Sequence, residues 1–153
     1  MRSQRSLESL LRREIRPTPQ IDLVGTTLIS IMLVEDSGAV RNRLRQILAE
    51  LEPFCIVGEY ETAPDAIAAI GPATPDVLLL DIKLRVGNGI EVLRHVRQQA
   101  AGTTVIVFSQ HDEPGYREQF QHAGAQFFFN KTCEAGKLIA TLTQLAAAVP
   151  DAS

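Results

Sequence analysis

Four apolar runs in this sequence end in polar side chains that could act together. The run 77–80 reads Val-Leu-Leu-Leu and leads directly to the carboxylate of Asp81. Such a run is typical of a strand that is buried on both faces of a parallel sheet. Open α/β sheets bind their ligands outside the carboxyl ends of their strands, so the side chains that follow these runs are expected to converge. These side chains are Glu35, Asp36, Asp81, Ser109 and Lys131.

The types of these side chains favour a site for a divalent cation and a phosphoryl group. Three carboxylates placed close together repel one another and raise their own pKa values unless a cation joins them. Mg²⁺ is a hard ion that binds one or two carboxylates, keeps several waters and accepts a phosphoryl oxygen. An ammonium group beside the ion would add the charge neutralisation that phosphoryl transfer requires.

Lys131 is better explained as an ammonium group directed at a phosphoryl group than as a generic surface charge. Only three of the 15 basic residues are lysines, so this chain mostly uses arginine for surface charge. A lysine is a compact point charge that can be aimed at a phosphate. Each residue also has a structural alternative, namely a solvated strand end for Lys131, a turn for Ser109 and a helix cap for Glu35-Asp36. Their joint placement favours the site.

The pattern between these residues predicts the elements that position them. The expected strands span 29–34, 55–60, 77–81, 104–109 and 126–130. Apolar residues at helical spacing follow each strand, and the last helix is expected to run to Pro150. Pro114 should open the fourth helix and Gly124 should end it, while His95 and His122 are expected on solvated helix faces. This alternation predicts an α/β fold with a doubly wound, five-stranded parallel sheet and helices on both faces.

Composition and charge narrow the class of protein. The 153 residues suit one domain, and 45% hydrophobic with 22% charged residues is ordinary for a soluble globular chain. A net charge of -3 does not favour direct binding of nucleic acid. No run approaches the roughly 18 apolar residues of a membrane span, and the basic N-terminus lacks the apolar core of a secretory signal. Cys55 and Cys133 are expected to stay reduced and unbridged, so we predict a cytoplasmic protein.

Residues 1–27 are expected to form a basic extension. Their first part carries five arginines against two glutamates, a net charge of +3. Leucine and isoleucine residues there follow helical spacing until Pro17 and Pro19 end the short helix. This helix could pack on its own domain, fray, or mediate homodimerisation or docking, and these alternatives are favoured over a weak membrane anchor. The remainder is predicted as one domain over 28–148 and a tail over 149–153, with no output domain.

Several motifs at the predicted strand ends occur together. They are Glu35-Asp36, Asp81-Ile82-Lys83-Leu84 with Gly89 beyond it, Ser109, and Gly124-Ala125 leading to Phe128 and Lys131. By these motifs, roughly residues 28–147 resemble the receiver domain of bacterial two-component response regulators. The resemblance implies a flavodoxin-like (βα)₅ fold with strand order 2-1-3-4-5. The aromatic-rich fifth strand is similar to that of stand-alone, chemotaxis-like receivers without an output domain.

The resemblance implies a chemical role for each residue of the acidic cluster. Asp81 would be the phosphoacceptor, phosphorylated by a sensor histidine kinase or a phosphotransfer protein. Asp36, Asp81 and the backbone carbonyl of Lys83 would hold Mg²⁺, with Glu35 acting through a water. Lys131 would pair with the oxygens of the incoming phosphoryl group.

The resemblance also implies how the signal would be read. Ser109 would donate a hydrogen bond to the phosphoryl group and move toward it, and Phe128 would turn inward when it does. The face made by the fourth helix, the fifth strand and the last helix would then shift and dock an unknown downstream protein. The chemistry implied is intrinsic self-phosphorylation and dephosphorylation, and not enzyme activity on a separate substrate.

Three positions depart from the usual receiver pattern. Thr132 follows the lysine where many receivers have a proline, Arg85 stands where a proline is common, and Gln110 follows the serine where a small residue is usual. A bulky Gln110 would shield the phosphoryl group from water. These departures keep open a pseudo-receiver or scaffold that acts through its N-terminal helix. A phosphate sink in a phosphorelay is a second alternative within the same fold.

Overall fold

A five-stranded sheet forms the middle layer of the molecule. The computed structural model describes residues 27–111 and 113–148. The strands are β1 (Ile29–Val34), β2 (Phe54–Tyr60), β3 (Val77–Leu80), β4 (Thr104–Ser109) and β5 (Phe127–Asn130). They pair in parallel in the order β2-β1-β3-β4-β5, so the predicted doubly wound sheet with strand order 2-1-3-4-5 is confirmed.

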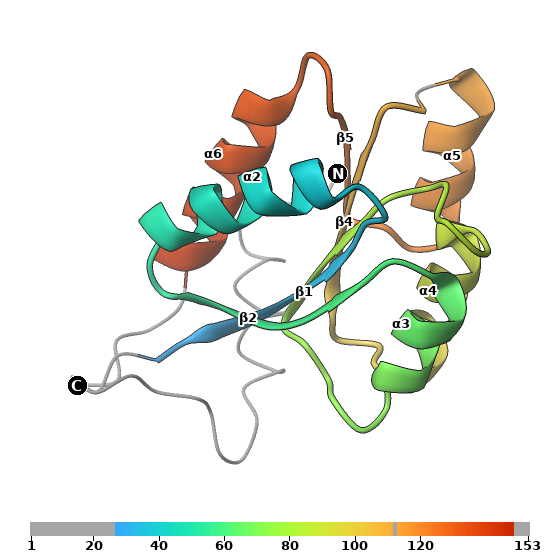
Figure 1. Cartoon of the computed structure of the whole chain (residues 1–153), viewed down its shortest axis with the longest axis horizontal. Coiled ribbons are helices and arrows are strands. Elements are labelled where there is room, and N and C mark those ends of the chain that lie inside the picture. The colour runs from blue at the N-terminus through green and yellow to red at the C-terminus, as the bar shows by residue number, and fades with distance from the viewer. Residues whose placement is uncertain (1–26, 112, 149–153) are drawn as a thin grey trace.

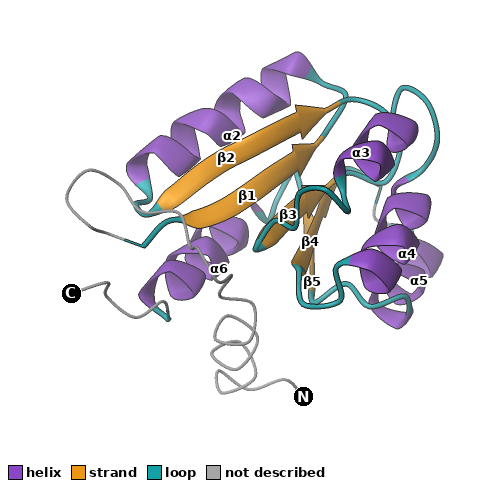
Figure 2. Cartoon of the chain, turned by 90° about the horizontal axis from the view of Figure 1, so that it is seen from below, coloured by secondary structure: helices purple, strands orange, loops and turns teal. Residues whose placement is uncertain are grey.

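Helices cover both faces of this sheet. Their bounds in the described ranges are Gly38–Glu50 for α2, Ala63–Ala69 for α3, Gly89–Gln99 for α4, Pro114–His122 for α5 and Ala135–Ala147 for α6. Helices α2 and α6 lie on one face, and α3, α4 and α5 lie on the other (Figures 1 and 2). Because both faces are covered, every residue of β1, β3 and β4 is buried, which explains why these strands read as apolar runs.

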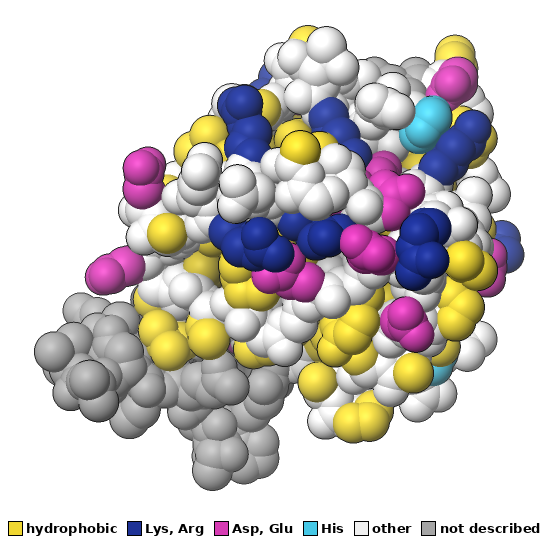
Figure 3. Space-filling view, viewed as in Figure 1, with side chains coloured by type: hydrophobic (Ala, Val, Ile, Leu, Met, Phe, Trp, Pro, Cys, Tyr) yellow, Lys and Arg dark blue, Asp and Glu magenta, His cyan; other side chains and the backbone are white. Residues whose placement is uncertain are grey.

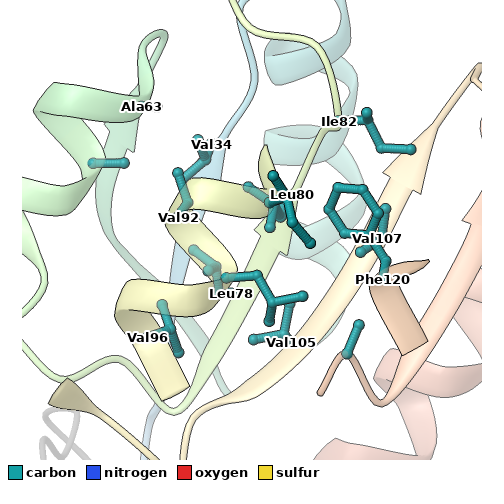
Figure 4. Close-up of a cluster of buried hydrophobic side chains, with 14 of the residues drawn as sticks. Val34, Ala63, Leu78, Leu80, Ile82, Val92, Val96, Val105, Val107 and Phe120 are labelled. Carbon is teal, nitrogen blue, oxygen red and sulfur yellow. The ribbon is translucent and has the colours of Figure 1, made fainter. Parts of the chain in front are cut away.

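Alternate residues of the central strands supply two separate cores. Leu78 and Leu80 belong to the core under α3, α4 and α5, which also contains Val107 and Phe120 (Figure 4). Leu79 belongs to the core under α2 and α6. Full burial of one such side chain contributes about 1.5–3 kcal/mol. The strands are therefore held firmly, and the side chains that follow them emerge at one edge.

Capping side chains order the turns at the carboxyl edge of the sheet. Ser37 caps α2 by accepting a hydrogen bond from the backbone N–H of Val40, and Thr62 caps α3 in the same manner. Asn88 and Glu91 form a reciprocal capping box at the start of α4. A capping side chain typically contributes about 1 kcal/mol to stability. Three of the loops that carry or flank the predicted site are thus fixed locally.

Several element boundaries differ from the sequence prediction by a few residues. β3 ends at Leu80, so Asp81 lies in the turn after the strand. β2 begins one residue earlier than predicted and β5 one residue later. α6 ends at Ala147, before Pro150, which lies outside the described residues.

The prediction that His95 is solvated is wrong. Its side chain is half-buried, and its Nε2 atom lies 3.0 Å from the carbonyl oxygen of Ile70. That carbonyl follows the end of α3, where a helix leaves backbone acceptors without intrahelical partners. His95 on the neighbouring α4 supplies the partner. His122 is exposed, as predicted.

Some predictions concern segments that the structure does not describe. The N-terminal extension up to residue 26 and the tail over 149–153 lie outside the described residues. Their proposed helix, their role in self-association and the domain limits therefore stay predictions. Cys55 and Cys133 are both free thiols, as expected. None of the described helices combines the length and the apolar character needed to cross a bilayer.

Candidate functional site

The predicted acidic residues lie together at the carboxyl edge of the sheet. Glu35 and Asp36 follow β1, and Asp81 follows the adjacent strand β3. One carboxylate oxygen from each of the three residues lies within 4.8 Å of the others. Glu35 and Asp81 are buried whereas Asp36 is exposed, so the cluster is open to solvent on one side.

The ammonium group of Lys131 joins two of these carboxylates. Its Nζ atom lies 2.5 Å from Oε1 of Glu35 and 2.9 Å from Oδ2 of Asp81. The second oxygen of Asp81 accepts a hydrogen bond from the backbone N–H of Ile82 at 2.8 Å. Lys131 follows β5, two strands away from β3, so the sheet topology brings it to the cluster. Its side chain is only 14% exposed, which shields these ion pairs from water.

The crowding of charges changes the acidity of Glu35. Burial and the negative charge of Asp81 raise the pKa of the Glu35 carboxyl from 4.5 to about 7, although Lys131 and the backbone N–H of Ser37 oppose this change. Burial acts to lower the pKa of the Lys131 ammonium, but its hydrogen bonds and ion pairs with Glu35 and Asp81 outweigh burial and raise that pKa. The single ammonium group of Lys131 therefore neutralises only part of the negative charge of these carboxylates.

This set of donors fits a hard divalent cation. The three carboxylates carry three negative charges when ionised, and Lys131 offsets one of them. Mg²⁺ would offset two more, and the exposed position of Asp36 leaves room for the waters that the ion retains. The alternative role of Glu35-Asp36 as a helix cap is not adopted. Ser37 caps α2, and Glu35 instead accepts a hydrogen bond from the backbone N–H of Ser37 at 3.0 Å.

Ser109 and Lys83 flank the acidic cluster. Ser109 ends β4 and is fully buried, and its backbone carbonyl accepts a hydrogen bond from the N–H of Lys131 at 3.0 Å. Its hydroxyl oxygen accepts a hydrogen bond from the N–H of His111 at 3.2 Å. Lys83 lies two residues after Asp81, is exposed and forms an isolated antiparallel bridge with Asn88. The structure thus places Ser109 beside the strand that carries the lysine and leaves Lys83 at the surface.

Phe128 lies on the α5 side of the sheet, in a buried position. Its side chain is 2% exposed and makes an edge contact with Phe120, with ring centroids 6.3 Å apart. Phe127 and Phe129 point to the opposite side of β5 and stack on each other at 6.1 Å. The aromatic residue that was predicted as a switch is therefore the one of these three that is fully buried.

Arg41 supports the site, and the sequence pattern did not predict it. Its Nη1 atom donates a hydrogen bond to the backbone carbonyl of Glu35 at 2.7 Å, and its Nη2 atom lies 3.0 Å from Glu61. Glu61 also pairs with Arg85 in the loop after β3. Figure 3 shows basic and acidic side chains intermixed across the middle of one face. An arginine early in a helix is too common for its sequence position to reveal this contact.

The other residues that depart from the usual receiver pattern lie at the rim of the site. The backbone N–H of Thr132 donates to Oδ1 of Asn130 at 2.8 Å, which shapes the turn after β5. Gln110 is exposed, and the ring of His111 makes an edge contact with Tyr116 at 6.5 Å. A side-chain hydrogen bond therefore orders the turn where many receivers have a proline.

Comparison with known proteins identifies the family. The profile of the response regulator receiver domain matches residues 31–143. The chain belongs to the response regulator receiver family. The transcriptional regulatory protein UhpA of Salmonella typhimurium is 33% identical over 120 residues, which cover 78% of this receiver and 59% of that protein. DegU of Brevibacillus brevis is 30% identical over 116 residues, which cover 76% of the receiver and 49% of DegU. The receiver therefore spans about half to three fifths of these relatives.

Solved structures share the fold of this receiver. A two-component response regulator of the LuxR family from Aurantimonas sp. SI85-9A1 superposes with a TM-score of 0.71 at 26% identity, covering 79% of the receiver and 86% of that chain. The response regulator domain of Thermotoga maritima CheB superposes at 0.70 with 26% identity, covering 80% and 99%. The receiver domain of the sensor kinase PA1611 from Pseudomonas aeruginosa PAO1 is 22% identical with a TM-score of 0.66, covers 78% and 98%, and shows the common fold.

Family membership fixes the general class of function. The chain is a receiver domain of two-component signalling, and membership of this family supports a phosphoacceptor function. The roles of the individual site residues stay predictions.

Proposed function

We propose that this receiver is a single-domain response regulator whose Asp81 accepts a phosphoryl group from a sensor histidine kinase or a phosphotransfer protein. The observation that carries this proposal is the position of Lys131, whose ammonium lies 2.5 Å from Glu35 and 2.9 Å from Asp81 beside a cluster of three carboxylates. The cluster supplies a nucleophile, and the lysine supplies a fixed positive charge for the transferred group.

Asp81 is the nucleophile in the proposed reaction. One oxygen of its carboxylate attacks the phosphorus of a phosphohistidine, and the new O–P bond forms as the N–P bond breaks. The histidine nitrogen keeps the electron pair of the broken bond. The backbone N–H of Ile82 orients the Asp81 carboxylate through its 2.8 Å hydrogen bond. Lys131 offsets the negative charge of the phosphoryl oxygens, which is the main task of a protein in this reaction.

Glu35, Asp36, Asp81 and the backbone carbonyl of Lys83 are the groups that would hold Mg²⁺. When bound, the ion supplies charge neutralisation to the phosphoryl oxygens. The PA1611 receiver is described with a magnesium ion coordinated in its active-site cleft. The three clustered carboxylates of this chain support the same ion here, since one lysine does not balance their charge.

Ser109 and Phe128 would transmit the phosphorylation state. The hydroxyl of Ser109 would donate a hydrogen bond to the phosphoryl group, and the inward position of Phe128 would accompany that contact. The face made by α5, β5 and α6 would then dock a downstream protein as one of two discrete arrangements. The burial of Phe128 under α5 supports this face as the one that responds.

We further propose that this domain has no enzyme activity on a separate substrate and does not bind nucleic acid directly. We place the domain in the cytoplasm. Relatives named as transcriptional regulators, and a protein-glutamate methylesterase of Koribacter versatilis, extend well beyond the part that this chain matches. Binding of the full chain to random DNA in a mobility-shift assay at physiological salt would contradict the second assignment.

Self-association through residues 1–27 is part of the same proposal. Size-exclusion chromatography with light scattering compares the full chain with a variant that starts at Leu28. If the full chain is a dimer and the variant that starts at Leu28 is a monomer, residues 1–27 mediate dimerisation. If both proteins have the same oligomeric state, this role is contradicted.

The phosphorylation test uses the full chain with acetyl phosphate and Mg²⁺, read by intact mass. The wild type should gain one phosphoryl group, and Asp81→Asn should gain none. Asp65→Asn, which removes an exposed carboxylate of α3, is the matched control and should behave as the wild type. An unmodified wild type would favour the pseudo-receiver, and modified Asp81→Asn would overturn the role of Asp81.

A further inference from the structure

We propose that Arg117 is a positioning residue that holds Phe128 inward and ties it to the turn that carries Lys131. Arg117 lies on α5 and contacts Phe128 on β5. A further partner of Arg117, Glu134, directly precedes α6. These are the three elements of the proposed output face. The inference rests on the proposed function, in which the position of Phe128 reports the phosphorylation state.

The side chain of Arg117 contacts the ring of Phe128. The central guanidinium carbon lies 4.7 Å from the centroid of that ring. Phe120, three residues further along α5, makes an edge contact with the same ring. A planar guanidinium stacks favourably on an aromatic face, and lysine cannot reproduce that stacking. Helix α5 thus holds the inward ring with both a cation and a second aromatic side chain.

The same guanidinium also forms a hydrogen bond with the backbone of Phe128. Its Nη1 atom donates a hydrogen bond to the carbonyl oxygen of Phe128 at 2.8 Å, and its Nη2 atom donates to Oε1 of Glu134 at 3.0 Å. Two nitrogens of one rigid fork therefore join β5 to the start of α6. Because the ring and the carbonyl belong to one residue, the inward ring position and the backbone position are stabilised together.

Glu134 extends this bridge to the turn after β5. Its Oε1 atom also accepts a hydrogen bond from the backbone N–H of Asn130 at 2.9 Å, and its Oε2 atom pairs with Lys137 at 2.9 Å. The hydrogen bonds from Lys137 and Asn130 lower the pKa of the Glu134 carboxyl to about 2, so this partner stays ionised. Asn130 directly precedes Lys131, which pairs with Asp81. The bridge from Arg117 to Glu134 therefore ends one residue from the site.

This arrangement has a thermodynamic consequence for ligand binding. A residue that stabilises only the inward position of Phe128 raises the apparent affinity for any ligand that favours this position. Beryllofluoride, a mimic of the phosphoryl group, is such a ligand under the proposed function. Removal of Arg117 should therefore reduce the inward population of Phe128 and weaken beryllofluoride binding.

The test labels the phenylalanines of the full chain with fluorine and follows them by NMR. The chain has six phenylalanines, and Phe128→Tyr identifies the resonance of Phe128. In Arg117→Ala this resonance should shift in the free protein, and beryllofluoride with Mg²⁺ should bind about five-fold more weakly or worse. Arg117→Lys, which keeps the charge and loses the planar fork, should restore the wild-type behaviour only in part.

Controls separate this inference from the proposed function. Arg43→Ala, which removes an exposed arginine of α2, should leave both readouts unchanged. If Arg117→Ala does not fold, as judged by circular dichroism, then Arg117→Lys and Glu134→Gln decide the question. Arg117 variants with wild-type resonances and affinity overturn the inference while the proposed function stands. If wild-type protein does not bind beryllofluoride, the proposed function is overturned. The role of Arg117 is then decided by whether the Phe128 resonance of the free protein shifts in Arg117→Ala.

Discussion

At the scale of single residues, Glu35 is a carboxyl group whose burial opposes its ionisation. Burial and Asp81 raise the pKa of its carboxyl to about 7. The unfolded chain has an ordinary glutamate pKa of about 4.3, so between these two values the folded protein binds a proton that the unfolded chain does not. The stability that Glu35 contributes is therefore present in full below the unfolded pKa and is lost as the pH rises through about 7.

Substitution of Glu35 tests this sign directly. Glu35→Gln keeps the shape of the side chain and cannot ionise. In a buffer with chelator, the free energy of unfolding of the variant minus that of the wild type should increase by about 1–3 kcal/mol between pH 5 and pH 8. Urea unfolding at both pH values measures this difference, and Glu118→Gln on the exposed face of α5 is the control. A difference that does not change with pH contradicts the assignment.

At the scale of elements, the start of α4 approaches the turn that carries Asp81 very closely. Gly89 is the first residue of α4. A Cβ atom added there would clash with the carbonyl oxygen of Asp81. The N–H of Gly89 donates to the carbonyl of Ile82 at 2.6 Å. Gly136 in α6 is the opposite case, because no described heavy atom outside its chain neighbours and the adjacent helix backbone lies within 4 Å of a Cβ added there. The two helical glycines should therefore respond oppositely to alanine.

Alanine substitutions compare these two glycines. Gly89→Ala should lower the free energy of unfolding by about 2 kcal/mol or more and slow phosphorylation of Asp81, because the turn must move. Gly136→Ala should raise the free energy of unfolding by about 0.5–1 kcal/mol, because alanine favours the helix. Denaturant titration of both variants provides the measurement. Equal effects at the two positions would refute the close-approach argument.

At the scale of the whole molecule, the site connects separate parts of one sheet. Its groups follow β1, β3, β4 and β5, and the groups assigned to Mg²⁺ follow the adjacent strands β1 and β3. A ligand that binds the folded state alone stabilises that state by mass action. Magnesium binding should therefore be visible in the stability of the entire domain.

Thermal unfolding with and without Mg²⁺ measures this effect. At a Mg²⁺ concentration ten times its Kd, the wild type should gain about 1.4 kcal/mol, with a corresponding rise in Tm. Asp36→Asn should lose most of the gain, because Asp36 is one of the three clustered carboxylates. Asp65→Asn should keep it. A wild-type Tm that stays the same from chelator to excess Mg²⁺ would rule out the divalent site.

The sequence pattern by itself predicted the fold class and the core of the site, and the resemblance to receivers supplied the strand order. Continuous apolar runs and helical spacing are local properties of the chain, and they predicted the strands and their alternation with helices. Glu35, Asp36, Asp81 and Lys131 could be placed together because the carboxyl ends of parallel strands share one edge. This rule needs only the order of the elements, which the sequence displays.

Only the tertiary structure decided which long side chains support that site. Arg117 reaches a carbonyl 11 positions away, and His95 reaches one 25 positions away. Arg41 contacts the backbone of Glu35 and not its carboxylate. Flexible side chains can extend in many directions, and a backbone carbonyl carries no residue identity. Such contacts therefore follow no sequence period, and they become visible once the helices are packed on the sheet.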